Sequence, residues 1–211
     1  MNKEEFIREL KLINIDISEE QLELLEEFYK LLIEWNEKIN LTRITEEKDV
    51  YLKHFYDSLT INKVVDLSKI ITLCDIGTGA GFPGIVLKII FPNLKVTLVD
   101  SLQKRVNYLN EVIRKLKLKD IEAIHTRGEE LKGQYEVVTS RAVANIEKLV
   151  KYTMHLVKKD GIFIAMKANI EEELTEKTKK ELEKKYRILN IEKFNLPVEN
   201  SVRSLVIMQN K

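Results

Sequence analysis

Residues 75–84 read DIGTGAGFPG and directly follow an apolar stretch that is typical of a buried strand. Four of these ten residues are glycine: Gly77, Gly79, Gly81 and Gly84. Glycine lets the main chain turn tightly and lie close to another molecule. Pro83 suits the first turn of a helix, since its missing N–H is not needed there. The stretch therefore predicts a strand, a glycine-rich turn and a helix, which is where open α/β sheets bind ligands.

Three classes of ligand compete for such a turn. A nucleoside triphosphate requires G-x-x-x-x-G followed by Lys, and Ile85 follows Gly84 here, which argues against a P-loop. A dinucleotide requires G-x-G-x-x-G, which residues 79–84 match. S-adenosylmethionine requires an acidic residue followed by G-x-G-x-G, which residues 75–81 match with Asp75 at the end of the strand. The turn alone leaves a dinucleotide and S-adenosylmethionine open.

A second acidic residue, Asp100, ends the stretch KVTLVD, 19 positions after Gly81. A carboxylate at the end of the second strand can accept hydrogen bonds from both hydroxyls of an adenosine ribose. The competing role is that of a helix N-cap, for which Ser101 is a rival. We predict ribose binding by Asp100, a role that fits either remaining ligand.

From residue 71 onward, short apolar runs alternate with helical segments, which predicts a parallel sheet with helices on both faces. The predicted strands span 71–75, 95–99, 121–125, 135–139 and 161–166. The predicted helices lie near 83–90, 102–117, 145–157 and 170–185. Two further strands, 187–194 and 203–209, have no helix between them, so we expect an antiparallel pair at the sheet edge. The fold class is therefore α/β, with a mostly parallel sheet.

The N-terminal segment has a purely helical pattern. Ser18 and Gln21 form a capping box, and apolar residues then recur every three or four positions. A second helical stretch follows around residues 46–64. We expect residues 1–66 to pack as a helical cap on a ligand-binding domain formed by residues 67–211.

Charge is divided unevenly along the chain, although the formal net charge is only +1. Residues 1–70 contain 10 Lys and Arg against 16 Asp and Glu, whereas residues 71–211 contain 25 against 18. A basic body suits an anionic polymer as partner, but solvated surface charge is the commoner explanation of such a bias.

Three features of the sequence bear on the compartment. The N-terminus MNKEEFIREL is charged and lacks an apolar signal core, and the sequence has no apolar run of roughly 18 residues. Cys74 is the single cysteine and lies in a predicted buried strand, so it can form neither a disulfide nor a metal site. We expect a cytoplasmic monomer that holds no metal and contacts no membrane.

The ends of the later strands favour S-adenosylmethionine. The third strand ends in HTRGEE, residues 125–130, where an adenine edge would be recognised, and the fourth runs into TSRA, residues 139–142. An antiparallel terminal pair in place of a second parallel half also suits a methyltransferase better than a dehydrogenase.

With these features, the sequence resembles a known family, the bacterial small-subunit (16S) ribosomal RNA guanine-N7 methyltransferases, called RsmG or GidB proteins. The resemblance spans most of the chain. Its motifs are Lys38-Ile-Asn40-Leu-Thr42, His54-Phe-Tyr-Asp57-Ser58-Leu, residues 75–84 with their GFPG ending, Leu98-Val-Asp100-Ser, Arg127-Gly-Glu129, Ser140-Arg141-Ala142 and Met166-Lys167.

The resemblance implies a Rossmann-like class I S-adenosylmethionine-dependent methyltransferase fold with a helical cap. It implies ribosomal RNA or the small ribosomal subunit as partner, and contacts to the cofactor from Gly77, Phe82, the Gly128–Glu129 main chain and Arg141. With the glycine motif, the predicted cofactor-binding residues are Asp75, Gly77, Thr78, Gly79, Gly81, Phe82, Asp100, Gly128, Glu129 and Arg141. Two positions depart from the family pattern, with Gly128 where Ala is usual and Ala168 where Gly is usual.

The lack of common acid–base motifs fits methylation of guanine N7. Cytosine C5 requires a cysteine nucleophile, and Cys74 lies inside a strand rather than on a loop. Exocyclic amines are usually methylated beside an Asn/Asp-Pro-Pro-aromatic loop after the fourth strand, and this place reads SRAVAN. The N7 lone pair carries no proton, so the enzyme need only hold donor and acceptor in line, about 3–3.5 Å apart.

Four residues are candidates for positioning the substrates: Arg141, Arg127, His54 and Lys167. Arg141 could bind the cofactor carboxylate or an RNA phosphate, and the alternative is a surface salt bridge. The same roles are open to Arg127. His54 lies one helical turn from Asp57, and the pair could touch RNA or form a hydrogen bond on a helix surface. Lys167, at the end of the fifth strand, faces the expected crevice.

We therefore predict methyl transfer from S-adenosylmethionine to N7 of a guanosine in 16S ribosomal RNA. Two alternatives remain. One is a methyltransferase that acts on another RNA or a small molecule. The other is a non-catalytic S-adenosylmethionine-binding factor in ribosome assembly.

Overall fold

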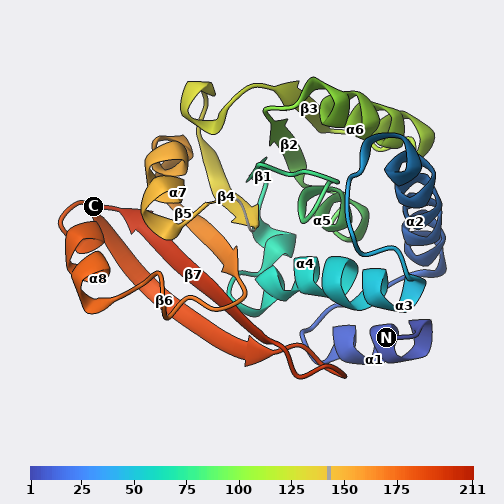
Figure 1. The fold of residues 1–211 in the computed structure, drawn as a ribbon, viewed down its shortest axis with the longest axis horizontal. Coiled ribbons are helices and arrows are strands. Elements are labelled where there is room, and N and C mark those ends of the chain that lie inside the picture. The colour runs from blue at the N-terminus through green and yellow to red at the C-terminus, as the bar shows by residue number, and fades with distance from the viewer. Residues whose placement is uncertain (142–143) are drawn as a thin grey trace.

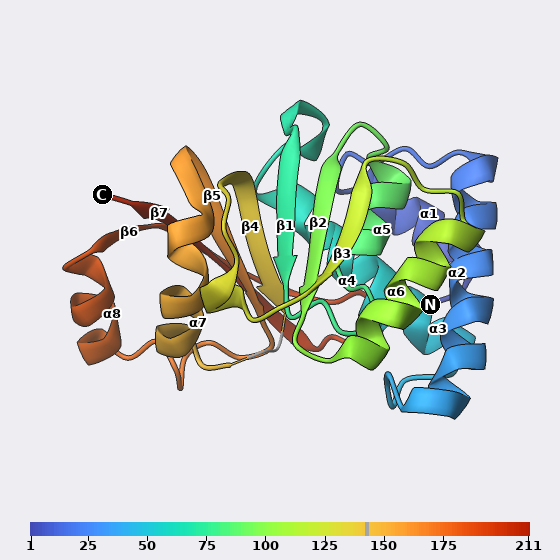
Figure 2. The same cartoon turned by 90° about the horizontal axis from the view of Figure 1, so that it is seen from above.

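The computed structural model describes residues 1–141 and 144–211. Its centre is a seven-stranded sheet with the order β3-β2-β1-β4-β5-β7-β6 (Figures 1 and 2). The strands are β1 Thr72–Ile76, β2 Lys95–Asp100, β3 Ile121–His125, β4 Tyr135–Arg141, β5 Val157–Lys167, β6 Tyr186–Asn195 and β7 Val202–Asn210. The chain runs outward from β1 to β3 and then returns to β4, so the carboxyl ends of β1 and β4 flank the ligand-binding crevice of an open α/β sheet.

Helices cover both faces of the sheet, as the continuous apolar strands predict. They are α5 Gly84–Ile90 and α6 Gln103–Lys115 on one face, and α7 Ile146–Thr153 and α8 Glu176–Glu183 on the other. Along β1 the side chain of Leu73 joins the first core and that of Cys74 joins the second. Each face therefore buries its own apolar cluster, and the sheet holds the two clusters apart.

The N-terminal helices join the core on the α5–α6 face. Helix α2, Glu19–Ile39, begins at the predicted capping box of Ser18 and Gln21. The Gln21 side-chain amide also donates to the main-chain oxygens of Ile89 and Ile90, where α5 ends. Helix α2 is thus tied to the helix that follows the glycine turn.

Aromatic packing connects the same segment to the turn itself. Phe28 of α2 lies against Phe55 and against Phe82 of the glycine turn, with ring centroids 5.8 and 5.4 Å apart. Helix α1, Lys3–Lys11, adds Phe6 to this core. The helical segment shares one apolar cluster with the sheet, and a domain boundary after residue 66 stays a prediction.

The structure confirms the predicted α/β fold, the five parallel strands and the antiparallel C-terminal pair. Four expectations differ in detail. Strand β5 begins at Val157, where the helix predicted near 145–157 was still expected, and four residues before the strand predicted over 161–166. The stretch 46–64 is broken into α3 Glu47–Val50, a π-helical segment Tyr51–Tyr56, α4 Asp57–Leu59 and a final 3₁₀ turn. The helix expected from residue 170 begins only at Glu176, because Thr175 caps it by accepting from the Thr178 N–H. Finally, in the antiparallel pair β7 lies between β5 and β6, so β6 alone forms this edge of the sheet, and β3 forms the opposite edge.

None of the helices in residues 1–141 and 144–211 is both long enough and apolar enough to span a membrane.

Candidate active site

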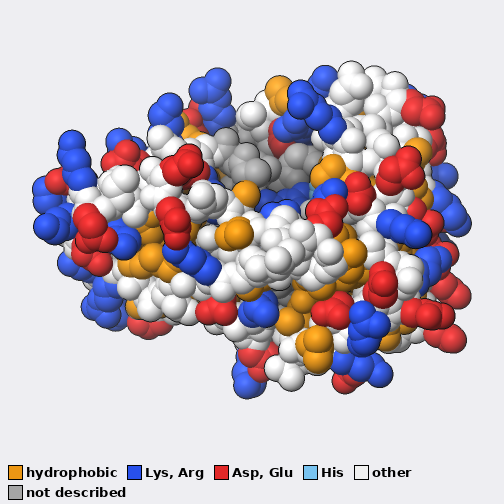
Figure 3. Space-filling model, turned by 60° about the horizontal axis from the view of Figure 1, so that its bottom comes forward, with side chains coloured by type: hydrophobic (Ala, Val, Ile, Leu, Met, Phe, Trp, Pro, Cys, Tyr) orange, Lys and Arg blue, Asp and Glu red, His pale blue; other side chains and the backbone are white. Residues whose placement is uncertain are grey.

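Two cavities open at the carboxyl edge of the sheet, and both use Gly77. The larger, about 360 Å³, is lined among others by Thr42, Lys53, His54, Asp57, Gly77, Thr78, Gly79, Phe82, Arg141, Met166, Lys167, Phe194 and Arg203. The smaller, about 250 Å³, is lined by Ile76, Gly77, Val99, Asp100, Ser101, Thr126, Arg127, Gly128, Glu129 and Tyr152. Figure 3 shows a hollowed face of the molecule with Lys and Arg side chains around the hollow.

The glycine turn has the main-chain geometry that its sequence predicts. Gly77, Gly79 and Gly81 all have positive φ angles, of 70°, 60° and 93°. A Cβ on Gly81 would also lie 2.6 Å from the Cδ1 of Ile85, so this glycine allows α5 to pack on the turn. Gly77 and Gly79 line the larger cavity, whereas Gly81 does not. A direct contact between Gly81 and the cofactor stays a prediction, and its visible role is in packing.

Asp75 lies beneath the turn and is completely buried. Its Oδ2 accepts hydrogen bonds from the Thr78 hydroxyl at 2.7 Å and from the Gly84 N–H at 2.9 Å. Its Oδ1 is buried without a hydrogen-bond partner among the described residues. Burial raises the pKa of this carboxyl from 3.8 to about 6, although both hydrogen bonds oppose the change. Asp75 thus holds the turn in shape, and its direct contact with a cofactor stays a prediction.

The stability of the variant Asp75→Asn relative to the wild type should rise between pH 4 and pH 8. An amide oxygen can keep both hydrogen bonds of Oδ2, and the variant removes the buried charge. Because the folded pKa is raised, ionised Asp75 destabilises the fold above pH 6, by roughly 2–3 kcal/mol, and this penalty fades as the pH falls toward 3.8. Urea unfolding between pH 4 and 8 should therefore show an advantage of Asp75→Asn that grows with pH.

The control for this experiment is Asp75→Ala, which removes the acceptor for both Thr78 and Gly84 and should destabilise at every pH. An advantage of Asp75→Asn that is the same at pH 4 and pH 8, or that is missing at both, would contradict a raised pKa.

Asp100 lines the smaller cavity and is nearly buried. Its Oδ2 accepts from the Gly79 N–H at 3.0 Å and pairs with Arg105 at 3.3 Å, and its Oδ1 accepts from the Leu102 N–H at 2.9 Å. Asp100 therefore makes an N-cap-like contact with the Leu102 N–H, just before α6. It also lines the cavity, and ribose binding there stays a prediction.

The residues predicted to lie beside an adenine also line this cavity. Gly128 is buried, and a Cβ there would lie 2.9 Å from the Cγ2 of Ile76, which explains why this chain has glycine at the position. Glu129 and Arg127 are exposed at the same cavity. Arg127 lines only this smaller cavity, so the structure separates it from the other positioning candidates.

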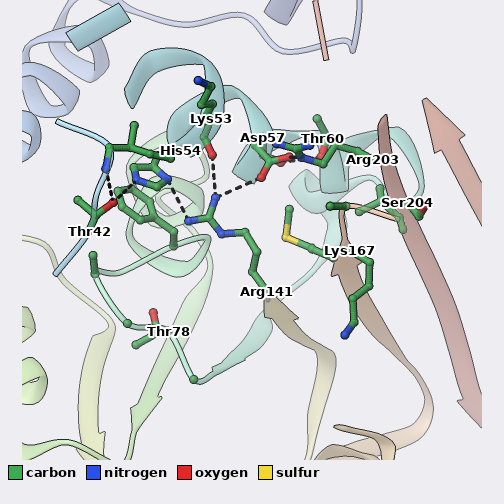
Figure 4. Close-up of a pocket in the computed structure, with 18 of the residues that line it drawn as sticks. Thr42, Lys53, His54, Asp57, Thr60, Thr78, Arg141, Lys167, Arg203 and Ser204 are labelled. Atoms are coloured by element: carbon green, nitrogen blue, oxygen red, sulfur yellow. Dashed lines mark hydrogen bonds and ion pairs between the residues drawn. The ribbon is translucent and has the colours of Figure 1, made fainter. Parts of the chain in front are cut away.

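Arg141 lies at the centre of the larger cavity (Figure 4). Its Nη1 donates to the main-chain oxygen of Lys53 at 2.9 Å and to Asp57 Oδ2 at 3.2 Å, and its Nη2 donates to His54 Nδ1 at 3.2 Å. All three acceptors come from the helical cap. The guanidinium also lies over the Phe82 ring, 5.1 Å from its centroid. Arg141 is therefore a partly buried junction between cap, sheet and glycine turn, and its ion pair with Asp57 lies in the cavity rather than on the open surface.

His54 is a neutral part of this junction. Burial and the Arg141 charge lower its pKa from 6.5 to about 3. Since a guanidinium can only donate, His54 Nδ1 must accept, so Nε2 carries the proton and donates to the Thr42 hydroxyl at 3.0 Å. The ring stacks on Phe82, with centroids 4.3 Å apart and planes inclined by 18°. His54 and Asp57 are both buried, which excludes the helix-surface pair that the sequence left open.

Lys167 reaches the edge of the larger cavity but is paired with its own loop. Its Nζ lies 3.0 Å from Glu173 Oε2 and donates to the main-chain oxygen of Ala144. Glu173 Oε2 in turn accepts from the Ile146 N–H, where α7 begins. Lys167 therefore connects the loop after β4 to the loop after β5, and a contact with RNA stays a prediction.

Arg203 is the site residue that the sequence alone did not reveal. It lies at the start of β7 and donates from Nε to Asp57 Oδ1 at 3.0 Å, across 146 positions of sequence. Its place at the site follows from the topology of the sheet rather than from a local sequence motif. An antiparallel strand next to β5 begins at the edge where the parallel strands end, so its first residues must lie near the ligand.

The two cavities meet at Gly77 of the glycine turn and differ in their lining. One cavity offers a carboxylate and a buried main-chain glycine, and the other offers aromatic, apolar and cationic groups. Among residues 1–141 and 144–211, no cluster of three or more His, Cys, Asp or Glu side chains could hold a metal ion.

Comparison with known proteins agrees with this architecture. The sequence model of the GidB family, described as rRNA small subunit methyltransferase G, matches residues 21–202. Proteins called ribosomal RNA small subunit methyltransferase G are similar over nearly the whole chain. The one from Bacillus pumilus is 44% identical over 100% of this chain and 91% of its own length. The one from Bacillus subtilis is 45% identical over 99% of this chain and 90% of its own.

A solved structure shows the same fold at low identity. The crystal structure of a SAM-dependent methyltransferase from Aquifex aeolicus superposes with a TM-score of 0.56 and 18% identity, over 77% of this chain and 93% of that one. The fold is thus that of the S-adenosylmethionine-dependent methyltransferases. With the family model and full-length relatives in agreement, this chain belongs to the GidB family, rRNA small subunit methyltransferase G.

Proposed function

We propose that this protein transfers the methyl group of S-adenosylmethionine to N7 of a guanosine in small-subunit ribosomal RNA. The observation that carries the proposal is the pair of cavities that meet at Gly77. A donor that occupies the smaller cavity and crosses the glycine turn would present its sulfonium group to the larger one.

Each half of the cofactor has a place in this arrangement. The adenosine would lie in the smaller cavity, with its ribose hydroxyls donating to Asp100 and its adenine beside Gly128. The methionine half would lie along Gly77–Gly79, with its carboxylate near Arg141, whose guanidinium is already oriented by the cap. This placement rests on the loop geometry and on the charge of the two side chains.

The larger cavity suits an acceptor that needs no deprotonation. His54 is neutral, and its Nδ1 already accepts from Arg141. Asp57 is already bound by two arginines. Neither group is poised as a general base, and guanine N7 requires none. The acceleration then comes from holding N7 in line with the methyl group, with the reacting atoms about 3–3.5 Å apart.

The experiment is methyl transfer from labelled S-adenosylmethionine to small ribosomal subunits from cells that lack the corresponding methyltransferase, followed by nucleoside analysis. We expect label in 7-methylguanosine. Purified small-subunit RNA, transfer RNA and free guanosine serve as parallel substrates. Label in a different nucleoside, or none in ribosomal RNA, would overturn the proposed function.

We propose further that the enzyme works as a monomer in the cytoplasm, away from membranes. The cytoplasmic location is supported by the location of ribosomal RNA in bacterial cells. The monomer is supported by the two cavities, which residues of a single chain line. Sedimentation of the purified protein at micromolar concentration tests the monomer directly.

A further inference from the structure

Arg203 sits at the edge of the larger cavity in a fixed orientation. Its Nε donates to Asp57 Oδ1 at 3.0 Å and its Nη1 donates to the Val202 main-chain oxygen at 2.9 Å. These bonds orient the guanidinium, and its Nη2 has no acceptor among residues 1–141 and 144–211. The side chain is 21% exposed, so it remains accessible from the cavity.

Two of the positive charges at the larger cavity share one carboxylate, whereas the others have their own partners. Lys53 pairs with Asp49 and Glu199, at 3.2 and 2.7 Å, and Lys167 pairs with Glu173. By contrast, Arg141 and Arg203 share the single carboxylate of Asp57.

We call these three residues the Arg141–Asp57–Arg203 cluster. The cluster contains two guanidinium groups and one carboxylate, so its formal charge is +1. Such a charge, enclosed in a cavity, is suited to bind an anionic ligand group.

The two arginines of the cluster lie at different distances from the glycine turn. Arg141 ends β4, directly beside β1, and its guanidinium lies over Phe82 of the turn. Arg203 is the second residue of β7, two strands further along the sheet, so the two backbones are roughly 10 Å apart at the usual strand spacing, although both side chains reach the carboxylate of Asp57. Arg141 is therefore placed for the cofactor, and Arg203 for whatever occupies the far side of the cavity.

We propose that Arg203 binds a phosphodiester group of the substrate RNA, next to the guanosine that is methylated. This inference rests on the proposed function. A base that enters between the glycine turn and β7 must bring its own backbone to the rim, where Arg203 lies beside Phe194. A guanidinium that donates through a free Nη2 matches a phosphate oxygen, and Asp57 supplies the orientation.

The test compares Arg203→Gln, which removes the charge, with Arg203→Lys, which keeps it. Affinity for unmodified small-subunit ribosomal RNA is measured at several salt concentrations. For the wild type we expect affinity to fall steeply with salt, and for Arg203→Gln we expect the slope of log K against log salt to be smaller by about 0.7–0.9, the value for one phosphate. The KM for RNA should rise about 10-fold, while the Kd for S-adenosylmethionine should change less than about 2-fold.

The matched control is Arg8→Gln, which removes one exposed positive charge from α1 and should leave the slope unchanged. Arg203→Lys should keep the wild-type slope even where its affinity is lower. Equal slopes for Arg203→Gln and the wild type would overturn the inference, as would a selective loss of cofactor affinity. A wild-type protein that forms no 7-methylguanosine in the same assay would instead overturn the proposed function, so the two failures are distinguishable.

Discussion

Replacing Arg141 with glutamine should lower methyl transfer more than any other single substitution in the two cavities. Loss of a charge-assisted contact with the cofactor carboxylate corresponds to about 1.5–3 kcal/mol, or a 10- to 100-fold higher Kd for S-adenosylmethionine. The same change releases Lys53, Asp57 and His54 of the cap, which misplaces the acceptor and costs roughly another 100-fold. We therefore expect kcat/KM to fall at least about 1,000-fold, measured with labelled cofactor and calorimetric titration.

The control for Arg141 is Arg114→Gln, which removes an exposed arginine that pairs only with its helical neighbour Glu111. Its cofactor affinity and rate should match the wild type. If Arg141→Gln bound S-adenosylmethionine as tightly as the wild type, the cofactor contact would be wrong. If it also kept the wild-type rate, the role of Arg141 as a junction would be wrong.

Asp100→Ala should give the second largest effect. It removes the carboxylate that we propose as acceptor for two ribose hydroxyls, and with it the acceptor for the Gly79 and Leu102 N–H groups. We expect the Kd for S-adenosylmethionine to rise about 100-fold or more, and the free energy of unfolding to fall by roughly 2–4 kcal/mol because two partly buried donors lose their partner. Calorimetric titration and urea unfolding measure the two effects separately.

Asp100→Asn separates the contribution of charge from that of hydrogen bonding. Its amide oxygen can satisfy one N–H of the pair, so stability should recover in part while cofactor affinity stays low. A Kd within about 3-fold of the wild type for Asp100→Ala would refute ribose binding and leave Asp100 only its contacts with the main chain.

Helix starts, turns and strands that depend on neighbouring residues could be predicted from the sequence. The capping box at Ser18 and the glycine turn follow from short-range patterns, and the structure has them where expected. The strands predicted over 95–99 and 135–139 are also present, and they extend to Asp100 and Arg141. The strand order was not predicted, because alternating strands and helices indicate a parallel sheet but leave the order of its strands open. The break in the stretch 46–64 was not predictable, since its π-helical segment gives no local signal in the sequence.

The cap junction escaped prediction because it depends on contacts across 80 or more positions. Arg141 meets Asp57 and His54 at separations of 84 and 87 residues, and Arg203 meets Asp57 at 146. Asp75 shows a different limit. Its motif position was evident, but whether its carboxylate faces the ligand or the turn depends on the packing of Thr78 and Gly84. Motifs thus identified most residues of the site, whereas Arg203 and the partners of each side chain depend on tertiary packing.

We propose that a sulfonium methyl donor spans the two cavities across the glycine turn. A crystal structure of the protein with S-adenosylmethionine tests it most directly. We predict the ribose hydroxyls on Asp100, the carboxylate on Arg141 and the methyl group directed into the cavity that Asp57 and Arg203 line. A turn left empty by this ligand but filled by a nicotinamide dinucleotide, or a methyl group directed away from that cavity, would contradict the account.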